Sequence, residues 1–272
     1  MANRRTDPVY LHDDGFVGVV PGDVFDLEGD EARHASTVRR HRDGEVLVIA
    51  DGAGTWLRGE VEGRSGRDRI QLRVLEVGIE PATRPRITVI QALPKTDRAD
   101  SAVELLTEVG VDRIAAWQAS RCVARWDADR AVRGLARWER TAREAAKQSR
   151  RTWTPDLVGP WRTVEAVAAV AAADLAFVLH ETAPQPLVAE LPPSGDPAEV
   201  VVVVGPEGGL TSDEVAALAA AGARVVGLGP TVMRTSTAGA VAVSLVAAAT
   251  GRLSHLNPLI GEVGTPDDMM SP

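Results

Sequence analysis

Short apolar runs alternate with glycine-containing turns over the first 80 residues. The runs at Val46–Ala50 and at 70–75 are each bounded by such turn sequences. Closely spaced strands joined by tight turns are typical of a small β-barrel. One helix is expected within this part, at 31–40. The pattern therefore predicts a β-rich domain over residues 1–80.

A proline-flanked segment at 80–85 is followed by a region in which strand and helix patterns alternate. The expected strands lie at 86–93, 113–117, 175–180, 199–204 and 225–228. The expected helices lie at 97–109, 128–149, 163–173, 211–222 and 236–249. The strand at 199–204 is Glu followed by five valines, so it is expected to be buried on both faces. This alternation predicts an α/β domain over 81–262 with a mostly parallel sheet covered by helices on both faces. Residues 263–272 are expected to form a disordered tail.

The size and composition of the chain narrow the protein class. The 272 residues are 44% hydrophobic, which is typical of a globular protein with a substantial core. No apolar run reaches the ~20 residues of a membrane-spanning helix, and the first residues lack the apolar segment of a secretory signal. The single cysteine, Cys122, excludes an intrachain disulfide. A cytoplasmic protein is therefore expected.

Positive charge is concentrated in one stretch of an otherwise acidic chain. The net charge is −8, yet residues 121–151 hold ten basic and four acidic residues, a local net charge of +6. In and just beyond the helix expected at 128–149, one face is small and apolar and the other is basic. The basic face consists of Arg130, Arg133, Arg137, Arg140, Lys147 and Arg151. It is interpreted either as a solvated helix face or as a surface that follows a phosphate backbone, which the scarcity of acidic neighbours favours.

Two loops carry the strongest indications of a ligand site. The first, Val-Gly-Pro-Glu-Gly-Gly-Leu-Thr at 204–211, lies between the buried strand and a helix that a Thr-x-x-Glu capping box opens. The second, at 228–238, also follows a strand and opens a helix. In open α/β sheets, ligands bind outside the carboxyl ends of the strands, and glycine permits close backbone approach. The alternatives are a simple glycine-rich turn and, in the second loop, helix capping by Thr235 or Ser236.

Together the two loops predict a pocket rich in backbone N–H and C=O groups, with Arg234 as its single fixed charge. Such a pocket suits a ligand that carries both an adenine ring and a zwitterion. The dinucleotide-binding and P-loop motifs are absent, as is the Gly-x-Ser-x-Gly motif of hydrolases. The histidines show no metal-ligand spacing, so no metal is expected. Cys122 is expected to be structural rather than nucleophilic.

These loops resemble those of the RsmE family, which belongs to the SPOUT superfamily of S-adenosyl-L-methionine-dependent RNA methyltransferases. The resemblance is carried by GPEGGLTSDEV at 205–215 and by 228–238, which ends Arg-Thr-Ser-Thr-Ala. Further similarity lies at 34–40, 95–98, 104–110, 121–122 and 144–151, and the resemblance covers most of the chain. The family ending is Arg-Thr-Glu-Thr-Ala, so Ser236 stands here in place of a glutamate.

The resemblance implies an α/β fold in which a trefoil-knotted SPOUT methyltransferase domain at 81–262 follows a PUA-like, RNA-binding β-barrel at 1–80. It implies a homodimer that methylates N3 of one uridine of 16S ribosomal RNA, in the decoding region of the 30S ribosomal subunit. The residues implied to bind S-adenosyl-L-methionine are Leu179, His180, Gly205, Pro206, Glu207, Gly208, Gly209, Leu228, Gly229, Val232, Met233, Arg234, Thr235, Ser236 and Ala238. The residues expected to hold the RNA are Arg33, His34, Arg39, Arg40, Arg42, Arg130, Arg133, Arg137, Arg140, Lys147, Arg150 and Arg151.

The chemistry of the implied reaction suggests two catalytic residues. Uridine N3 carries a proton and is a poor nucleophile until that proton leaves. Arg234 is expected to stabilise the developing uracil anion or to hold a flanking phosphate. Glu207, or a water held by its loop, is the candidate base. Two alternatives stay open: a related SPOUT enzyme that acts on transfer RNA or on a ribose 2′-hydroxyl, and an RNA-binding protein with little or no catalytic activity.

Overall fold

The structure, a computed structural model, describes residues 7–66, 68–95, 98–191, 197–254 and 259. The chain folds into two compact units. The first contains the N-terminal residues to Pro81 together with 150–153 and Leu259, and the second contains 82–149 and 154–254. The tail predicted at 263–272 lies outside the described residues.

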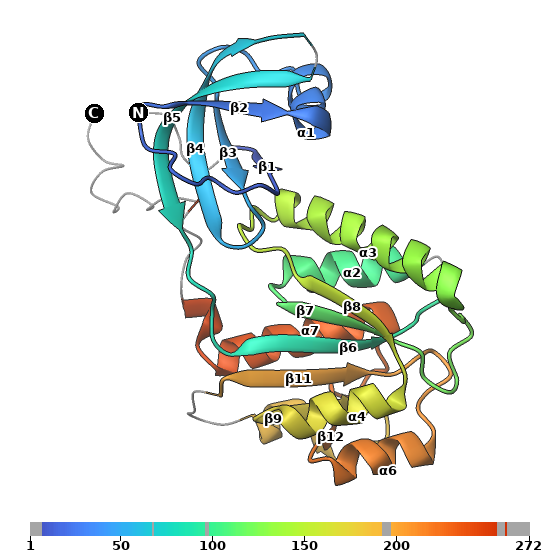
Figure 1. The fold of residues 1–272 in the computed structure, drawn as a ribbon. Coiled ribbons are helices and arrows are strands. Elements are labelled where there is room, and N and C mark those ends of the chain that lie inside the picture. Colours follow the sequence, from blue (N-terminus) through green and yellow to red (C-terminus); the bar gives the residue numbers. More distant parts are fainter. Residues whose placement is uncertain (1–6, 67, 96–97, 192–196, 255–258, 260–272) are drawn as a thin grey trace. The chain divides into compact units, whose positions relative to one another are not determined.

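The first unit is built on a five-stranded sheet, which Figure 1 draws in blue to teal. Its strands are β1 (Val9–Leu11), β2 (Val24–Glu28), β3 (Val46–Ala50), β4 (Thr55–Arg64) and β5 (Arg69–Ile79). The strand order is β1-β3-β4-β5-β2, with β1 parallel to β3 and every other pair antiparallel. One core, which includes Leu27, Leu47, Leu57 and Leu72, lies against the sheet. The β-rich prediction is confirmed, and closure into a barrel stays a prediction.

The prediction of one helix at 31–40 is wrong in its bounds and in its helix type. The structure has a short helix α1 (Gly29–Arg33) that continues as one turn of π-helix, η2 (His34–Val38). The hydroxyls of Ser36 and Thr37 both donate to the carbonyl oxygen of Arg33, and such side-chain bonds compete with regular helical pairing. The segment ends at Arg40, whose φ of 56° is unusual for a residue with a side chain.

A segment distant in sequence completes this unit. The Trp153 indole N–H donates to the carbonyl oxygen of Glu80 at 3.0 Å, and the Gly54 N–H donates to the carbonyl oxygen of Thr152 at 3.2 Å. A Cβ on Gly54 would lie 2.6 Å from the Trp153 ring, so only glycine leaves room for this tryptophan. The sequence-based division into 1–80 and 81–262 places residues 150–153 in the second domain, whereas in the structure they belong to the first unit.

The second unit is an α/β layer structure. Its strands are β6 (Arg86–Ala92), β7 (Arg113–Trp117), β8 (Asp156–Trp161), β9 (Leu175–Leu179), β10 (Gln185–Pro186), β11 (Glu199–Val204) and β12 (Arg224–Gly227). Its helices are α2 (Ala99–Glu108), α3 (Ala128–Gln148), α4 (Thr163–Ala172), α5 (Leu187–Glu190), α6 (Ser212–Ala220), α7 (Thr235–Ala249) and the short 3-10 helix η3 (Arg252–Ser254). All strand pairs are parallel, in the order β10-β12-β9-β11-β6-β7-β8. Helices cover both faces, with α2, α3 and α7 packed together and α4 against α6.

The α/β prediction for this unit is confirmed, because β6, β7, β9, β11 and β12 all lie within two residues of their expected bounds. The five valines of β11 are buried, as a strand in the middle of a two-sided sheet requires. The strands β8 and β10 lie at the sheet edges and were not predicted. Both contain a proline, Pro160 and Pro186, which sequence patterns associate with loops but which edge strands tolerate.

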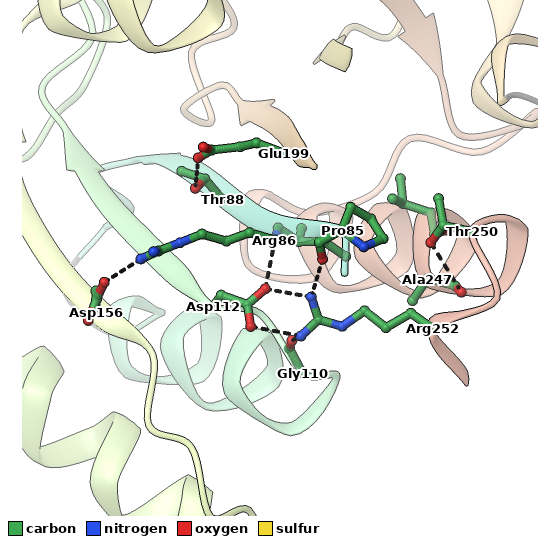
Figure 2. A network of polar contacts seen from close by, with 12 residues as sticks. Pro85, Arg86, Thr88, Gly110, Asp112, Asp156, Glu199, Ala247, Thr250 and Arg252 are labelled. Atoms are coloured by element: carbon green, nitrogen blue, oxygen red, sulfur yellow. Dashed lines mark hydrogen bonds and ion pairs between the residues drawn. The ribbon is translucent and has the colours of Figure 1, made fainter. Parts of the chain in front are cut away.

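A buried polar cluster fixes the end of the sheet opposite the predicted loops (Figure 2). Arg252, just after α7, donates to Asp112 Oδ1 and Oδ2 at 2.8 and 2.5 Å, and to the carbonyl oxygens of Pro85 and Gly110, both at 2.6 Å. Asp112 Oδ2 also accepts the Ile87 N–H at 2.7 Å. Because the Arg252 side chain is only 8% exposed, these bonds are shielded from water. They connect the end of α7 with the start of β6 and the start of β7.

Candidate functional site

The two predicted loops meet in one cavity at the carboxyl ends of β9, β11 and β12. Its volume is about 460 Å³, within the range usual for small-molecule sites. Of the residues expected to bind S-adenosyl-L-methionine, those that line it are Leu179, His180, Gly205, Pro206, Glu207, Gly208, Gly209, Leu228, Gly229, Val232, Met233, Thr235 and Ala238. Loops far apart in sequence are thus brought together as the sequence predicts, while the role of each residue stays a prediction.

The first loop is shaped by its glycines. Gly209 adopts a φ of +72°, which favours glycine, and its N–H donates to the carbonyl oxygen of Pro206 at 2.9 Å. A Cβ on Gly208 would lie 3.1 Å from the carbonyl oxygen of Arg121. The loop therefore runs so close to its neighbour that a side chain at 208 would displace one of them.

The second loop is connected to the first by a hydrogen bond. The Thr235 hydroxyl, in the first turn of α7, donates to the carbonyl oxygen of Gly205 at 3.1 Å. Thr235 is therefore a cross-link between the loops, and Arg234 is the residue at the N-cap position. Val232 lines the cavity although it is 78% exposed, so this loop offers an apolar surface at the opening.

Hydrogen bonds to Glu214 hold the end of the first loop in place. It forms a capping box with Thr211, whose N–H and hydroxyl donate to Oε2 at 2.9 and 3.0 Å. Its Oε1 accepts the Ser120 N–H at 2.8 Å. Burial acts to raise the pKa of Glu214, but the hydrogen bonds from Thr211 and Ser120 outweigh it and hold the pKa below the ordinary value. A buried, ionised carboxylate thus joins the loop after β7 to the loop after β11.

Two of the predicted cofactor residues do not line the cavity. Arg234 is exposed, and Ser236 is buried within α7 at 8% exposure. Arg121, which was not among the predicted site residues, does line the cavity. It was missed because it follows β7, far from the glycine-rich loops in sequence, and the similarity of Arg121-Cys122 to a family block did not by itself indicate a place in the cavity.

The basic face of α3 is only partly available. Arg137 donates to Asp100 Oδ2 at 2.5 and 3.0 Å, and this hydrogen bond raises the pKa of Arg137 further above its ordinary value. Lys147 is buried and lies 2.7 Å from Glu144, so it does not belong to the exposed face. Arg133 and Arg140 are exposed and have no side-chain partner among the described residues. The helix therefore presents fewer free cations than its sequence indicates.

The basic residues expected to hold RNA in the first unit lie on and beyond η2. Arg33 pairs with Asp30 at 2.9 Å, while Arg39 and Arg42 are exposed and form no side-chain hydrogen bond or ion pair in the described part of the chain. The next residue beyond Arg40, His41, contacts the Tyr10 hydroxyl at 2.8 Å and Glu45 at 2.6 Å. These contacts fix the position of the segment that carries the arginines.

Three further expectations concern metal, membrane and thiol chemistry. Among the described residues, no group of three or more His, Cys, Asp or Glu side chains could hold a metal ion. Within the same residues, no helix has the length and apolar character needed to cross a bilayer. Cys122 is buried, and burial raises the pKa of its thiol. A raised pKa disfavours the thiolate, which agrees with a structural role.

Comparison with known proteins places these features in a family. An RNA methyltransferase domain matches residues 81–247, and an RNA methyltransferase PUA domain matches 27–75. Ribosomal RNA small subunit methyltransferase E of Mycobacterium tuberculosis is 47% identical over 243 residues, which cover 87% of this chain and 92% of the relative. The Bacillus subtilis protein of the same name is 28% identical over 232 residues, with 82% and 89% covered.

A solved structure shows the same fold. The ribosomal RNA small subunit methyltransferase E of Neisseria gonorrhoeae, bound to S-adenosyl methionine, superposes with a TM-score of 0.79. It is 24% identical and the match covers 90% of this chain and 98% of that one. The resemblance noted in the sequence is therefore confirmed: the chain belongs to the RsmE family, the ribosomal RNA small subunit methyltransferases E.

Proposed function

We propose that this protein transfers a methyl group from S-adenosyl-L-methionine to N3 of a uridine in 16S ribosomal RNA of the small ribosomal subunit. The observation that carries the proposal is the cavity formed by the loops at 204–211 and 228–238, in a chain of this family. The relatives are named for methylation of small-subunit ribosomal RNA. We assign the reaction to the cytoplasm because ribosomal RNA is its substrate.

The cavity suits the proposed cofactor in size and in chemistry. A volume of about 460 Å³ accommodates a ligand of this class. Backbone N–H and C=O groups of the first loop offer hydrogen bonds that an adenine ring and an amino-acid group need, while Leu179, Leu228 and Met233 supply apolar surface. When bound, S-adenosyl-L-methionine supplies an electrophilic methyl group on a sulfonium. The residues proposed to hold it are those that line the cavity.

Two residues are proposed to act on the uridine and its strand. Glu207 lines the cavity, and its Oε1 accepts the Lys95 N–H at 3.2 Å. This bond leaves the other carboxylate oxygen available, so Glu207 is proposed to accept the N3 proton, directly or through water. Arg234 is exposed and outside the cavity lining. Of the two roles that the sequence suggests for it, the contact with a flanking phosphate is the one we propose.

The remaining architecture is proposed from the family resemblance. The second domain, 81–262, is proposed to form a trefoil knot and a homodimer, and the first, 1–80, a PUA-like barrel. In each unit the exposed arginines are proposed to hold the RNA backbone: Arg33, Arg39, Arg40 and Arg42 in the first, with Arg130, Arg133 and Arg140 in the second. Such contacts position RNA without reading its sequence. The uridine must leave its stack to enter a cavity of this kind.

The test is transfer of a labelled methyl group from S-adenosyl-L-methionine to 30S subunits that lack the modification, followed by identification of the methylated nucleoside. We expect N3-methyluridine. A methylated transfer RNA or a 2′-O-methylated nucleoside would replace the proposed specificity with that of another SPOUT enzyme. Cofactor binding without transfer would indicate an RNA-binding protein, and absence of binding would refute the assignment of both loops.

A further inference from the structure

A second group of loops lies at the carboxyl edge of the sheet, after β6 and β7. The loop after β6 places the Lys95 N–H 3.2 Å from Glu207. The loop after β7 places Arg121 Nη1 at 3.4 Å from the carbonyl oxygen of Gly208 and 3.3 Å from that of Leu210. The first cavity loop is therefore bordered on one side by the loops after β9 and β12 and on the other by these two.

The loop that carries Arg121 is held firmly. The N–H of Ser120 donates to the buried Glu214, and the Trp126 N–H donates to Gln118 Oε1 at 2.7 Å. The Trp126 ring lies over Gly134 of α3, where a Cβ would be 2.5 Å from the ring. Both ends of residues 118–127 are thus fixed to helices, α6 and α3. The backbone position of Arg121 is therefore set before any ligand binds, which is an advantage for a group that must meet a reactant.

Of the described residues that line the cavity, Arg121 is the only lysine or arginine. Its two hydrogen bonds use Nη1 alone and are long, so Nε and Nη2 have no acceptor among the described residues. In that same part of the chain no carboxylate forms an ion pair with it. A guanidinium has five N–H donors in a fixed plane. Arg121 therefore brings unused donors and a positive charge without a direct ion pair to a cavity whose other lining residues include the acids Glu181 and Glu207.

We propose that Arg121 binds the uracil ring of the target uridine and stabilises the negative charge that develops on it during methyl transfer; this rests on the function proposed above. In that reaction the N3–H bond breaks and its proton passes to Glu207 or to water. The N3 electron pair then forms the bond to the methyl carbon, and the sulfur keeps the electron pair of the S–CH₃ bond. While the proton is leaving, negative charge spreads over N3 and the two carbonyl oxygens of the ring.

The direction from which Arg121 enters favours the uracil over the cofactor. The other lining residues come from the loops after β9, β11 and β12, whereas Arg121 comes from the loop after β7, two strands beyond β11. It therefore stands at the border of the cavity, where a second reactant would approach. Arg234 lies outside the lining, so Arg121 is the fixed cation that can face the reacting base.

The test compares Arg121→Gln and Arg121→Lys with the control Arg224→Gln in the full-length protein. Arg224 begins β12, the strand next to the edge strand β10, and forms an exposed pair with Glu190. For each variant, kcat and KM for 30S subunits, the calorimetric Kd for S-adenosyl-L-methionine and the pH profile of kcat are measured. We expect Arg121→Gln to lower kcat about 100-fold, as loss of a donor to a developing anion does. The Kd should change by less than about threefold, Arg121→Lys should recover part of kcat, and the control should match the wild type.

The pH profile separates a charge effect from a structural one. Because higher pH itself favours the uracil anion, the kcat deficit of Arg121→Gln should shrink between about pH 7 and about pH 9. A deficit that is the same at every pH would mean that Arg121 only braces the loop, and would overturn the proposal. A weakened cofactor Kd with unchanged kcat would assign Arg121 to the cofactor carboxylate. A raised KM with unchanged kcat would assign it to an RNA phosphate.

The wild type distinguishes this inference from the function on which it rests. If wild-type protein transfers no methyl group to 30S subunits, the proposed function fails, and the role of Arg121 fails with it. If the wild type is active and Arg121→Gln retains full kcat, only the assignment of Arg121 is overturned.

Discussion

Replacing Glu214 by glutamine should destabilise the second unit and loosen the cavity at the same time. Glu214 is 4% exposed, and its carboxylate accepts hydrogen bonds from the Thr211 N–H and hydroxyl and from the Ser120 N–H. Glutamine keeps one acceptor oxygen and places an NH₂ group where the second oxygen was. Because the donors approach both oxygens, at least one backbone N–H then faces another donor.

The size of the effect follows from these contacts. An unsatisfied buried N–H costs about 1–3 kcal/mol, and the bonds that survive lose the strength that the charge gave them. We expect Glu214→Gln to lower the free energy of unfolding by about 2–4 kcal/mol, or about 4–16 °C in Tm for a unit of this size. Glu165→Gln is the matched control, because Glu165 occupies the same capping-box position in α4 but is exposed. Glu165→Gln should lower the free energy of unfolding by less than about 1 kcal/mol.

The dependence on pH provides a second, independent measure. The pKa of Glu214 lies below its ordinary value of 4.5. A lowered pKa in the folded state means that the contribution to stability is complete above the ordinary pKa and is lost as pH falls through the folded value. The stability difference between wild type and Glu214→Gln should therefore be full near neutral pH and shrink in acid. Chemical denaturation of both proteins across this pH range is the assay.

The same variant should weaken cofactor binding, since Glu214 joins the loop of Ser120 to the loop of Thr211. If Glu214→Gln lowers the free energy of unfolding no more than Glu165→Gln does near neutral pH, the structural role of the buried carboxylate is refuted. It is also refuted if the stability difference between wild type and Glu214→Gln is the same in acid as near neutral pH.

Three further outcomes follow from the structure. Arg252→Met should lower the free energy of unfolding by about 3 kcal/mol because it leaves Asp112 without its buried partner. A double-mutant cycle with Asp112→Asn should give a coupling free energy above about 1 kcal/mol, and a smaller value would contradict the prediction. Gly208→Ala should raise the cofactor Kd about tenfold, because its methyl group would press on the neighbouring loop at 3.1 Å, whereas Gly63→Ala, with open space at its Cβ, should not. Arg133→Gln should reduce the slope of log Kd for RNA against log salt by about 0.7–0.9 if Arg133 contacts one phosphate, and an unchanged slope would remove it from the RNA surface.

The elements that sequence predicts well are those whose signals are local and whose burial is complete. The strand β11 is five valines after Glu199, and the helix that follows begins with a capping box at Thr211. Each signal acts within a few residues, and tertiary packing agrees with it. The edge strands are different, because β8 contains Pro160 and β10 is only two residues long. Such strands exist because a neighbouring strand offers hydrogen bonds, which no local pattern records.

The site also has one part that the sequence predicts and one part that it does not. The glycine-rich loops are recognisable because close backbone approach and a positive φ require glycine at particular positions, and Gly208 and Gly209 meet that requirement. Which charged side chains are free and which are paired is harder to predict from sequence. The sequence of α3 suggests a continuous basic face, but Asp100 of α2 and Glu144 neutralise two of its members. Asp100 is 37 residues away from its partner, and helix periodicity gives no information about such a neighbour.

Arg234 and Arg121 show that a residue close to a motif in sequence can lie outside the cavity while a distant residue lines it. Arg234 lies within the second cavity loop, yet it occupies the N-cap of α7 and is not among the residues that line the cavity. Arg121 is more than 80 residues from either loop and lines the cavity. A parallel sheet brings the carboxyl ends of its strands to one edge, so residues after β7 and β11 meet there whatever their separation in sequence. In folds of this kind, a cation that lines the pocket should therefore be sought after the neighbouring strands as well as within the loop motif itself.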